Sequence, residues 1–236
     1  MEGTSSFALL ELFQLGGIFM WPLLAFSVAT VAIALERIIY LGRHNLRIDD
    51  LKLETEKYIR SGRFAEAGEF LEKQTDKRMG ARVLFALVSN ADLPEYELAE
   101  KAAEAEAGEC IASLENGFNY LTALGSLSPL TGFLGTVSGM IGAFRSIAEA
   151  EDVSAQIVAN GIYEALITTV FGLCIAIVAM IAHSLFSGAV DKFAGNIEKA
   201  CSDLIIDIAK FRHYGKTEES PAPQSEPVPV DEQNEN

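Results

Sequence analysis

The chain has 236 residues, of which 50% are hydrophobic, and its formal net charge at pH 7 is −15. Such an apolar composition favours a membrane protein over a soluble domain, and the acidic residues lie almost entirely outside the longest apolar stretches. The acidity excludes nucleic acid from the expected partners, because binding to phosphates requires clustered Lys and Arg side chains.

Three runs without a charged side chain, 12–35, 116–144 and 165–190, each exceed the roughly 20 residues that a helix needs to cross a bilayer. We therefore predict an all-α integral membrane protein with three transmembrane helices and long cytoplasmic helical extensions. Twelve of the eighteen Lys and Arg residues lie between the first and second runs, and none precedes the first run. By the positive-inside rule, we expect an N-out/C-in topology.

The predicted segments can be placed in chain order. They are a short external N-terminal helix (1–14), transmembrane helix 1 (15–36), a cytoplasmic helical region (37–114), transmembrane helix 2 (115–144), a short external connection (145–160), transmembrane helix 3 (161–188), a cytoplasmic helical extension (189–215) and a disordered tail rich in Pro and Glu (216–236). No basic residue precedes the first apolar run, so we expect a retained span and not a cleaved signal peptide.

The cytoplasmic region shows apolar residues at helical intervals, with a break at Ser61-Gly62. From Pro94 no further Pro or paired Gly occurs before Pro129, so one long helix is expected to rise from this region into the second span. The region is interpreted either as an extension of the membrane bundle or as a self-contained helical domain.

The second span carries glycines at spacings of three and four residues, which form a ridge for close packing against another helix. They are Gly132, Gly135, Gly139 and Gly142. Pro129, in the same span, removes one backbone hydrogen bond and is expected to bend the helix. Thr136 lies mid-span, where a hydroxyl either bonds its own backbone or lines a polar path.

Glu164 is the only acidic residue between positions 153 and 190. Acids inside apolar spans commonly mark ion routes, but Glu164 could also lie at the outer interface, in the first turn of the helix. Thr168 shares a helix face with Glu164, whereas Thr169 is turned by roughly 140° from it. Two adjacent hydroxyls cannot share one face, so at least one is expected to point away from the neighbouring helix.

The three cysteines lie far apart, with no CxxC pair and no His at metal-ligand spacing. The sequence also has no nucleophile motif or phosphate-binding loop. We therefore expect no metal, no cofactor and no enzymatic activity.

Three sequence motifs, one in each span, resemble those of the MotA/TolQ/ExbB proton channel family, and specifically its three-span ExbB/TolQ branch. The resemblance covers about residues 15 to 190. The motifs are Pro22-Leu-Leu-Ala-Phe-Ser27 followed by Glu36-Arg37, then Ser128-Pro-Leu-Thr-Gly-Phe-Leu-Gly-Thr-Val-Ser-Gly-Met-Ile-Gly-Ala-Phe144, and Gly161-Ile-Tyr-Glu-Ala-Leu-Ile-Thr-Thr-Val-Phe-Gly172. Ser128 and Thr131 depart from the family pattern, in which Ala and Leu are usual.

The resemblance implies a multi-pass protein of the bacterial inner membrane in which five copies surround two single-span helices of an ExbD/TolR-like partner. It implies that Thr136 and Thr169 line a proton path and that Glu164 faces the central pore; we place Thr168 in the same group and Gly172 with the packing glycines. Protons would pass by way of a partner aspartate, and a TonB- or TolA-like protein and membrane lipid are further expected partners.

The function that the resemblance implies is a channel-forming subunit of a proton-driven motor, ExbB-like, energising TonB-dependent outer-membrane transport. The alternatives are a TolQ-like subunit for envelope integrity and a non-conducting membrane scaffold. A flagellar stator of the MotA kind is disfavoured, because those proteins carry a fourth span.

Overall fold

The structure, a computed structural model, describes residues 13–91, 96–149 and 155–218. Every long element in these ranges is an α-helix. The expected N-terminal helix at 1–14 lies outside the described residues except for a helical turn at 13–15, and the tail beyond residue 218 lies outside them as well.

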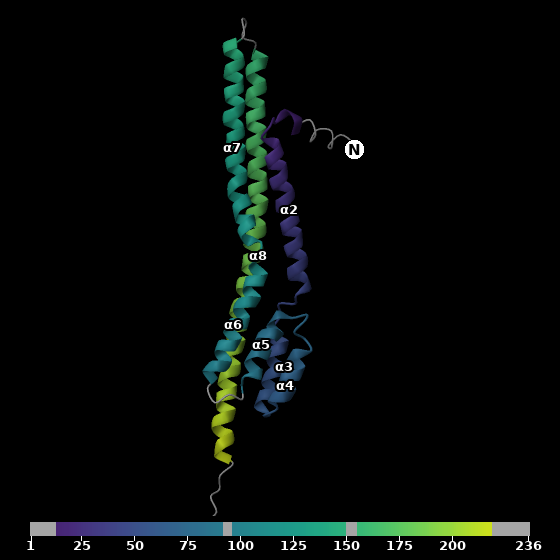
Figure 1. Ribbon diagram of the computed structural model, residues 1–236, viewed down its shortest axis with the longest axis vertical. Helices are drawn as coiled ribbons and strands as arrows, with labels where there is room; N and C mark the ends of the chain where they lie inside the picture. Colours follow the sequence, from purple (N-terminus) through teal and green to yellow (C-terminus); the bar gives the residue numbers. More distant parts are fainter. Residues whose placement is uncertain (1–12, 92–95, 150–154, 219–236) are drawn as a thin grey trace, which may run out of the picture.

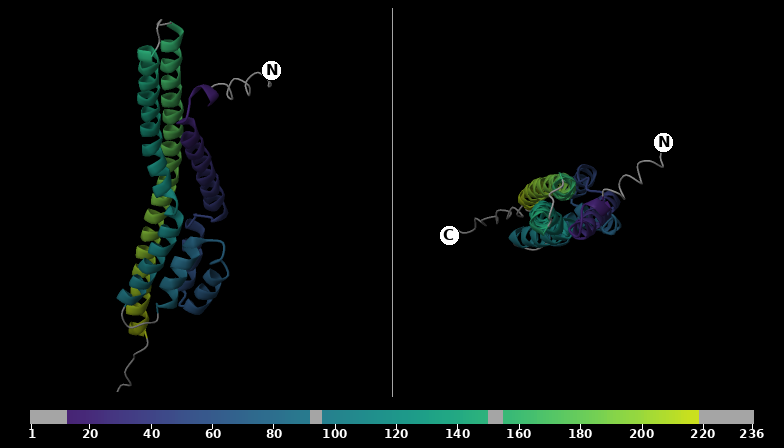
Figure 2. Two further views of the ribbon diagram at one scale, coloured as in Figure 1. Left: turned by 45° about the horizontal axis from the view of Figure 1, so that its top comes forward. Right: turned by 90° about the horizontal axis from the view of Figure 1, so that it is seen from above.

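Three helices are long and apolar enough to cross a membrane, as the charge-free runs predict. They are α2 (Met20–Arg43), α7 (Phe118–Glu149) and α8 (Ala155–Glu218). Helices α7 and α8 lie side by side and antiparallel over the full length of α7, and α2 leans against the pair (Figure 1). The view along the long axis shows all the helices gathered in one narrow column (Figure 2).

The helices α7 and α8 continue beyond the expected boundaries of the second and third spans. The short external connection expected at 145–160 is helical at 145–149 and again from residue 155. Arg145 donates to Glu149 one turn later at 2.9 Å, and such a pair supports the last turn of α7. The hairpin therefore projects past the N-terminal end of α2 (Figure 1).

The remaining helices form a bundle beside the other half of α8. They are α3 (Asp49–Arg60), α4 (Phe64–Glu72), α5 (Met79–Ser89) and α6 (Tyr96–Glu115). The break expected at Ser61-Gly62 is present, and Gly62 adopts a φ of +71°, which favours glycine.

The core of this bundle is shared with α8, so the four helices do not form a self-contained unit. Large side chains from α3, α5 and α6 are fully buried together with side chains from the C-terminal half of α8. This core includes Leu51, Ile59, Leu84, Leu87, Leu114, Phe193, Ile197 and Leu204. The bundle is thus an extension of the membrane helices, which was the first of the two interpretations of the sequence.

The helix expected to run without a break from Pro94 towards Pro129 is divided by a turn at Asn116 and Gly117 into α6 and α7. Gly117 has a φ of +88°, a conformation in which an L side chain would be strained. Since a single glycine supplies this turn, no paired glycine or proline in the sequence marks it. The turn separates the bundle helix α6 from the membrane helix α7.

Candidate functional site

The polar residues of the second and third spans meet where α7 crosses α8. The carbonyl oxygen of Gly132 accepts hydrogen bonds from the hydroxyls of both Thr168 and Thr169, each at 3.3 Å. We expected one of these adjacent hydroxyls to point away from the neighbouring helix, and the structure shows that neither does. Gly132 has no side chain, so the backbone of α8 comes close enough for both hydroxyls to reach the same oxygen.

The glycine ridge of α7 permits this approach. A Cβ atom at Gly132 would lie 2.8 Å from the Thr168 carbonyl oxygen, and one at Gly135 would lie 2.5 Å from the Thr168 hydroxyl. A Cβ atom at Gly139 would lie 3.0 Å from the carbonyl oxygen of Gly161. Real Cβ atoms do not fit at the two shorter distances, so glycine is required at the first two positions.

Other residues assigned to helix packing lie in different surroundings. A Cβ atom at Gly172 would lie 2.5 Å from the Ser128 carbonyl oxygen, so Gly172 is a contact of α8 with α7. Pro129 lies inside α7 and cannot donate to the carbonyl of Gly125. A Cβ atom at Gly142 would meet no described atom within 4 Å, so Gly142 lies on a face of α7 turned away from α8, whereas the next residue, Ala143, still packs against Gly161.

The hydroxyls assigned to the proton path differ in their access to the surroundings. Thr168 is fully buried and also donates to the Ala165 carbonyl at 2.9 Å, so it fills the crossing of the two helices. Thr169 and Thr136 are only partly buried. Thr136 donates to its own helix, to the Phe133 carbonyl at 2.7 Å. Of the three, Thr136 and Thr169 remain accessible to a further helix.

Glu164 lies level with the start of α2. A Cβ atom at Gly17 would overlap the carboxyl group of Glu164, and one at Gly16 would lie 3.3 Å from Ile167. Gly17 has a φ of +66°, so the turn before α2 folds over the Glu164 side chain by a conformation that favours glycine. This contact between the turn and Glu164 was not anticipated from the sequence.

The other end of the apolar layer is marked by the rings of Phe118 and His183, whose centroids are 5.8 Å apart. Along α8 the distance from Glu164 to His183 is about 28 Å at 1.5 Å per residue, close to the roughly 30 Å of a hydrocarbon core. Glu164 and His183 are therefore separated along α8 by about the thickness of a hydrocarbon core, and Thr168 and Thr169 lie between them.

Sequence reasoning missed the role of Arg37, which we noted only as part of a motif. Its side chain is buried and donates to the carbonyl oxygens of Ser113 and Leu114 at 3.3 and 3.4 Å. These carbonyls belong to the last turn of α6. Carbonyl groups in the last turn of a helix have no N–H donor within the helix, and their partial negative charge favours a nearby cation. Arg37 also pairs with Glu36 and lies over the ring of Tyr40. The sequence feature that could have revealed this role is the charged pair Glu36-Arg37 directly after the first apolar run.

A second polar group absent from the sequence-based predictions is the hydroxyl of Thr30 on α2. Thr30 is buried, and its Oγ1 has no hydrogen-bond partner in the described part of the chain. A buried hydroxyl without a partner is unfavourable. Thr30 thus adds a polar atom to the contact between α2 and the α7–α8 pair.

The cysteines outside the membrane layer are not poised for nucleophilic chemistry. Burial raises the pKa of the Cys201 thiol to about 12 and also raises the pKa of Cys110. Both thiols therefore stay protonated near neutral pH. Within the described ranges, no group of three or more His, Cys, Asp and Glu side chains is arranged to hold a metal ion.

Comparison with known proteins agrees with this arrangement of helices and polar residues. The family model of the MotA/TolQ/ExbB proton channel family matches residues 66–199. The chain belongs to this family. The match spans α7 and most of α8, including Thr136, Glu164, Thr168 and Thr169, whereas Arg37 and α2 precede it.

Individual members of the MotA/TolQ/ExbB family are similar over much of the chain. The putative biopolymer transport protein ExbB-like 3 of Synechocystis sp. is 34% identical and covers 72% of this chain and 81% of its own length. ExbB-like 1 of the same organism is 32% identical and covers 81% of this chain and 77% of its own length. The Tol-Pal system protein TolQ of Haemophilus influenzae is 42% identical over 36% of this chain and 39% of its own length.

Proposed function

We propose that the chain is the channel-forming subunit of a motor driven by the proton-motive force in the bacterial inner membrane. The observation that carries this proposal is the set of polar side chains on the α7–α8 pair: Glu164, which lies under the turn before α2, and Thr136 and Thr169, which are partly accessible. A helix pair that only anchored a bundle would not require a carboxyl group and accessible hydroxyls within its spans.

The proton carrier in this proposal comes from a partner. The three charge-free runs contain no aspartate, so an ExbD-like single-span helix would supply the carboxylate that binds and releases the proton, next to Thr136 and Thr169. Five copies of the chain would surround two such helices, in an N-out/C-in topology, and the assembly would have no enzymatic activity. A proton that crosses 100 mV delivers about 2.3 kcal/mol, enough to drive modest rearrangements between ring and partner.

We favour an ExbB-like role, energising TonB-dependent outer-membrane transport, over a TolQ-like role in envelope integrity. Two relatives named ExbB-like match over 72% and 81% of this chain, two named ExbB match over 46% and 38%, and the TolQ relative matches over 36%. In the TolQ-like alternative a TolA-like protein would take the place of the TonB-like one.

The partner assignment is tested by the native mass of the detergent-purified protein, co-expressed with the single-span protein encoded beside it. We expect a complex of five copies of this chain with two of the partner. A ring or a smaller species that never takes up the single-span protein would contradict the motor proposal.

A second experiment separates a proton channel from a non-conducting scaffold. Thr169→Ala removes the hydroxyl and should abolish proton flux through the reconstituted complex, whereas Thr169→Ser keeps the hydroxyl and should retain most of it. Thr122→Ala is a matched control, since the Thr122 hydroxyl bonds its own helix at the Phe118 carbonyl. If Thr169→Ala assembles and conducts like the unaltered protein, the proton path does not include Thr169, and the scaffold alternative is favoured.

A further inference from the structure

An open cavity of about 690 Å³ lies where α2 leaves the apolar layer. One side of it is the last two turns of α2, from Glu36 to Arg43, and the other side is the turn between α4 and α5 at Asp76 and Lys77. Tyr40 contributes to this cavity and to a smaller neighbouring one of about 370 Å³. Neither cavity includes a residue of the candidate proton path.

The lining combines two cations and one carboxylate that have no ion-pair partner among the described residues. The cations are Arg43, on the last turn of α2, and Lys77, and the carboxylate is that of Asp76. The second acidic residue, Glu36, accepts a hydrogen bond from the Arg37 guanidinium at 2.7 Å, so its charge is already balanced. The cavity therefore offers two positive groups and one negative group to a ligand.

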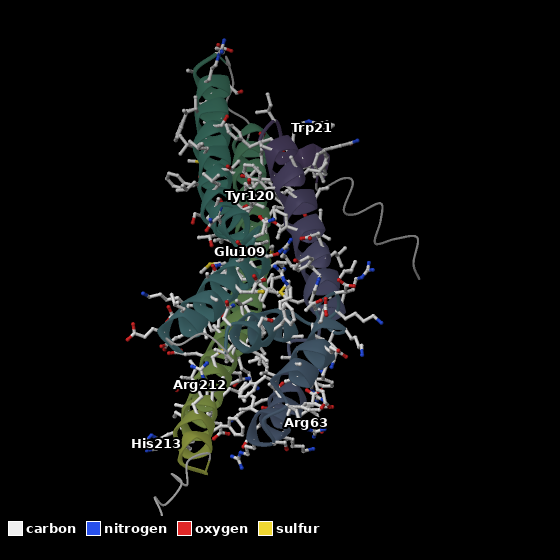
Figure 3. All side chains as sticks on the ribbon, turned by 60° about the horizontal axis from the view of Figure 1, so that its bottom comes forward. Trp21, Arg63, Glu109, Tyr120, Arg212 and His213 are labelled. Carbon is white, nitrogen blue, oxygen red and sulfur yellow. The ribbon has the colours of Figure 1, made fainter. Side chains whose placement is uncertain are left out.

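The cavity lies at the end of an exposed apolar stripe of α2. Val28, Leu35 and Ile39 follow one face of the helix and are each more than half exposed, at 62%, 54% and 59%. Arg43 is next on the same face, one turn beyond Ile39. Trp21 lies at the opposite end of α2 (Figure 3), as aromatic residues do at a membrane interface. The stripe thus follows α2 from Val28 onward and ends in the charged cavity.

We propose that this cavity binds the headgroup of a membrane glycerophospholipid. The phosphate lies between Arg43 and Lys77, and the hydrogen-bond donor at the end of the headgroup, an ammonium or a hydroxyl group, binds the Asp76 carboxylate. The acyl chains lie along the stripe of α2. Basic pockets beside membrane helices are known to take lipid headgroups, and Arg and Lys are suited to phosphate.

The stripe favours a lipid over a soluble phosphate compound. A free phosphate or phosphate ester would use only the charged groups and would leave Ile39 in the cavity wall without an apolar partner. The carboxylate of Asp76 sets the headgroup class, because it requires a donor on the ligand. Phosphatidylethanolamine and phosphatidylglycerol carry such a donor, whereas the quaternary ammonium of phosphatidylcholine does not.

The test uses the full chain in detergent, stripped of lipid and titrated separately with phosphatidylethanolamine, phosphatidylglycerol and phosphatidylcholine, with bound lipid counted by native mass spectrometry. We expect phosphatidylethanolamine and phosphatidylglycerol to be retained in preference to phosphatidylcholine. Arg43→Gln with Lys77→Gln should weaken retention of the first two by at least about tenfold, since each cation near a phosphate contributes about fivefold. Asp76→Asn should reduce the preference over phosphatidylcholine.

The matched control is Lys101→Gln with Lys192→Gln, which removes the same charge from exposed positions outside the cavity. It should retain lipid like the unaltered protein. Equal retention of all three lipids, or unchanged retention in the Arg43 and Lys77 variant, would overturn the proposal. Displacement of bound lipid by millimolar inorganic phosphate would also overturn it, because the site would then be one for soluble phosphate. None of these outcomes depends on proton conduction, so the proposal stands apart from the motor function.

Discussion

A single carbonyl oxygen, that of Gly132, accepts hydrogen bonds from two consecutive threonines of the facing helix. In an apolar layer, polar side chains are stable when their hydrogen bonds are made within the protein. The Thr168 hydroxyl is also held by its own helix and is buried, whereas Thr169 stays partly accessible. Two neighbouring residues of one type thus have different surroundings, and the accessible one is the better candidate for contact with a partner.

The first prediction at this scale concerns Arg37, which joins α2 to the end of α6. Arg37→Met removes the donors to the Ser113 and Leu114 carbonyls and should lower the free energy of unfolding by about 2 to 3 kcal/mol. Arg37→Lys keeps the positive charge but not the planar guanidinium group with its several donors, so it should recover only part of the lost free energy of unfolding. Chemical unfolding in detergent measures both variants. Equal stability of Arg37→Met and the unaltered protein would show that the contact is not needed.

The second prediction concerns Gly17, which covers the Glu164 carboxyl group. Gly17→Ala should destabilise the protein by about 1 kcal/mol or more, because the φ of +66° disfavours a side chain and the new methyl group would displace Glu164. Gly42→Ala is the control, since nothing lies within 4 Å of its Cβ position and alanine favours the helix. Thermal unfolding midpoints of the two variants should therefore shift in opposite directions.

Among the elements, the α7–α8 pair depends on small residues along one stripe of each helix. The buried positions of α7 recur every three or four residues and include Gly125, Gly132, Gly135 and Gly139. Because lipid is as apolar as the side chains, close packing supplies most of the attraction between two membrane helices. The same α8 then uses larger apolar residues, such as Phe193 and Ile197, to pack against the wider bundle outside the layer.

Two glycines of the same ridge test this packing. Gly135→Ala places a methyl group against the Thr168 side chain and should destabilise the protein by about 1 to 3 kcal/mol. Gly142→Ala, two turns further along α7, meets open space and should be neutral or stabilising by up to about 1 kcal/mol. Unfolding free energies of the two variants, measured under identical detergent conditions, give the comparison. A loss in both would mean that the packing surface of α7 includes the face that carries Gly142.

For the whole molecule, α8 is the axis that joins the membrane layer to the α3–α6 bundle. Lys52 and Arg60 of α3 form ion pairs with Asp203 and Asp207 of α8, and Gly62 lies against the ring of Phe211. Within the bundle, Arg78 donates to the Asp50 carboxylate at 2.5 and 2.6 Å. The pairs with Asp203 and Asp207 fix the bundle against α8, and the pair of Arg78 with Asp50 inside the bundle can be tested by acidification.

The pH prediction rests on Asp50, whose pKa is lowered from 3.8 to about 2 by the hydrogen bonds from Arg78. Because the pKa is depressed in the folded state, the stabilisation is present above about pH 4 and is lost as the pH falls towards 2. The effect should be at most about 1 kcal/mol, since the Asp50 side chain is exposed to solvent. Thermal unfolding between pH 7 and 2 should therefore depend less steeply on pH in Asp50→Asn than in the unaltered protein, and Asp49→Asn serves as the control.

The sequence predicted the elements of the fold well, because charge-free length and glycine spacing are local properties. The three spans, the break at Ser61-Gly62 and the membership in the MotA/TolQ/ExbB family all followed from short stretches of residues. The extent of the helices was less well predicted. The turn at Asn116 and Gly117 rests on a single glycine, and the helical continuation at 145–149 is supported by one ion pair between Arg145 and Glu149, so neither has a strong signature in the sequence.

The sequence by itself determined that the chain is helical, crosses a membrane and carries a carboxyl group and several hydroxyls within or beside its apolar spans, because these facts depend on residue type and spacing alone. Only the tertiary structure decided which of those groups meet. It placed both Thr168 and Thr169 on one carbonyl, Gly17 on Glu164, Arg37 on the end of α6, and Arg43 opposite Lys77 around a cavity. These contacts join residues far apart in the chain, so their geometry depends on how the helices pack and not on any local pattern.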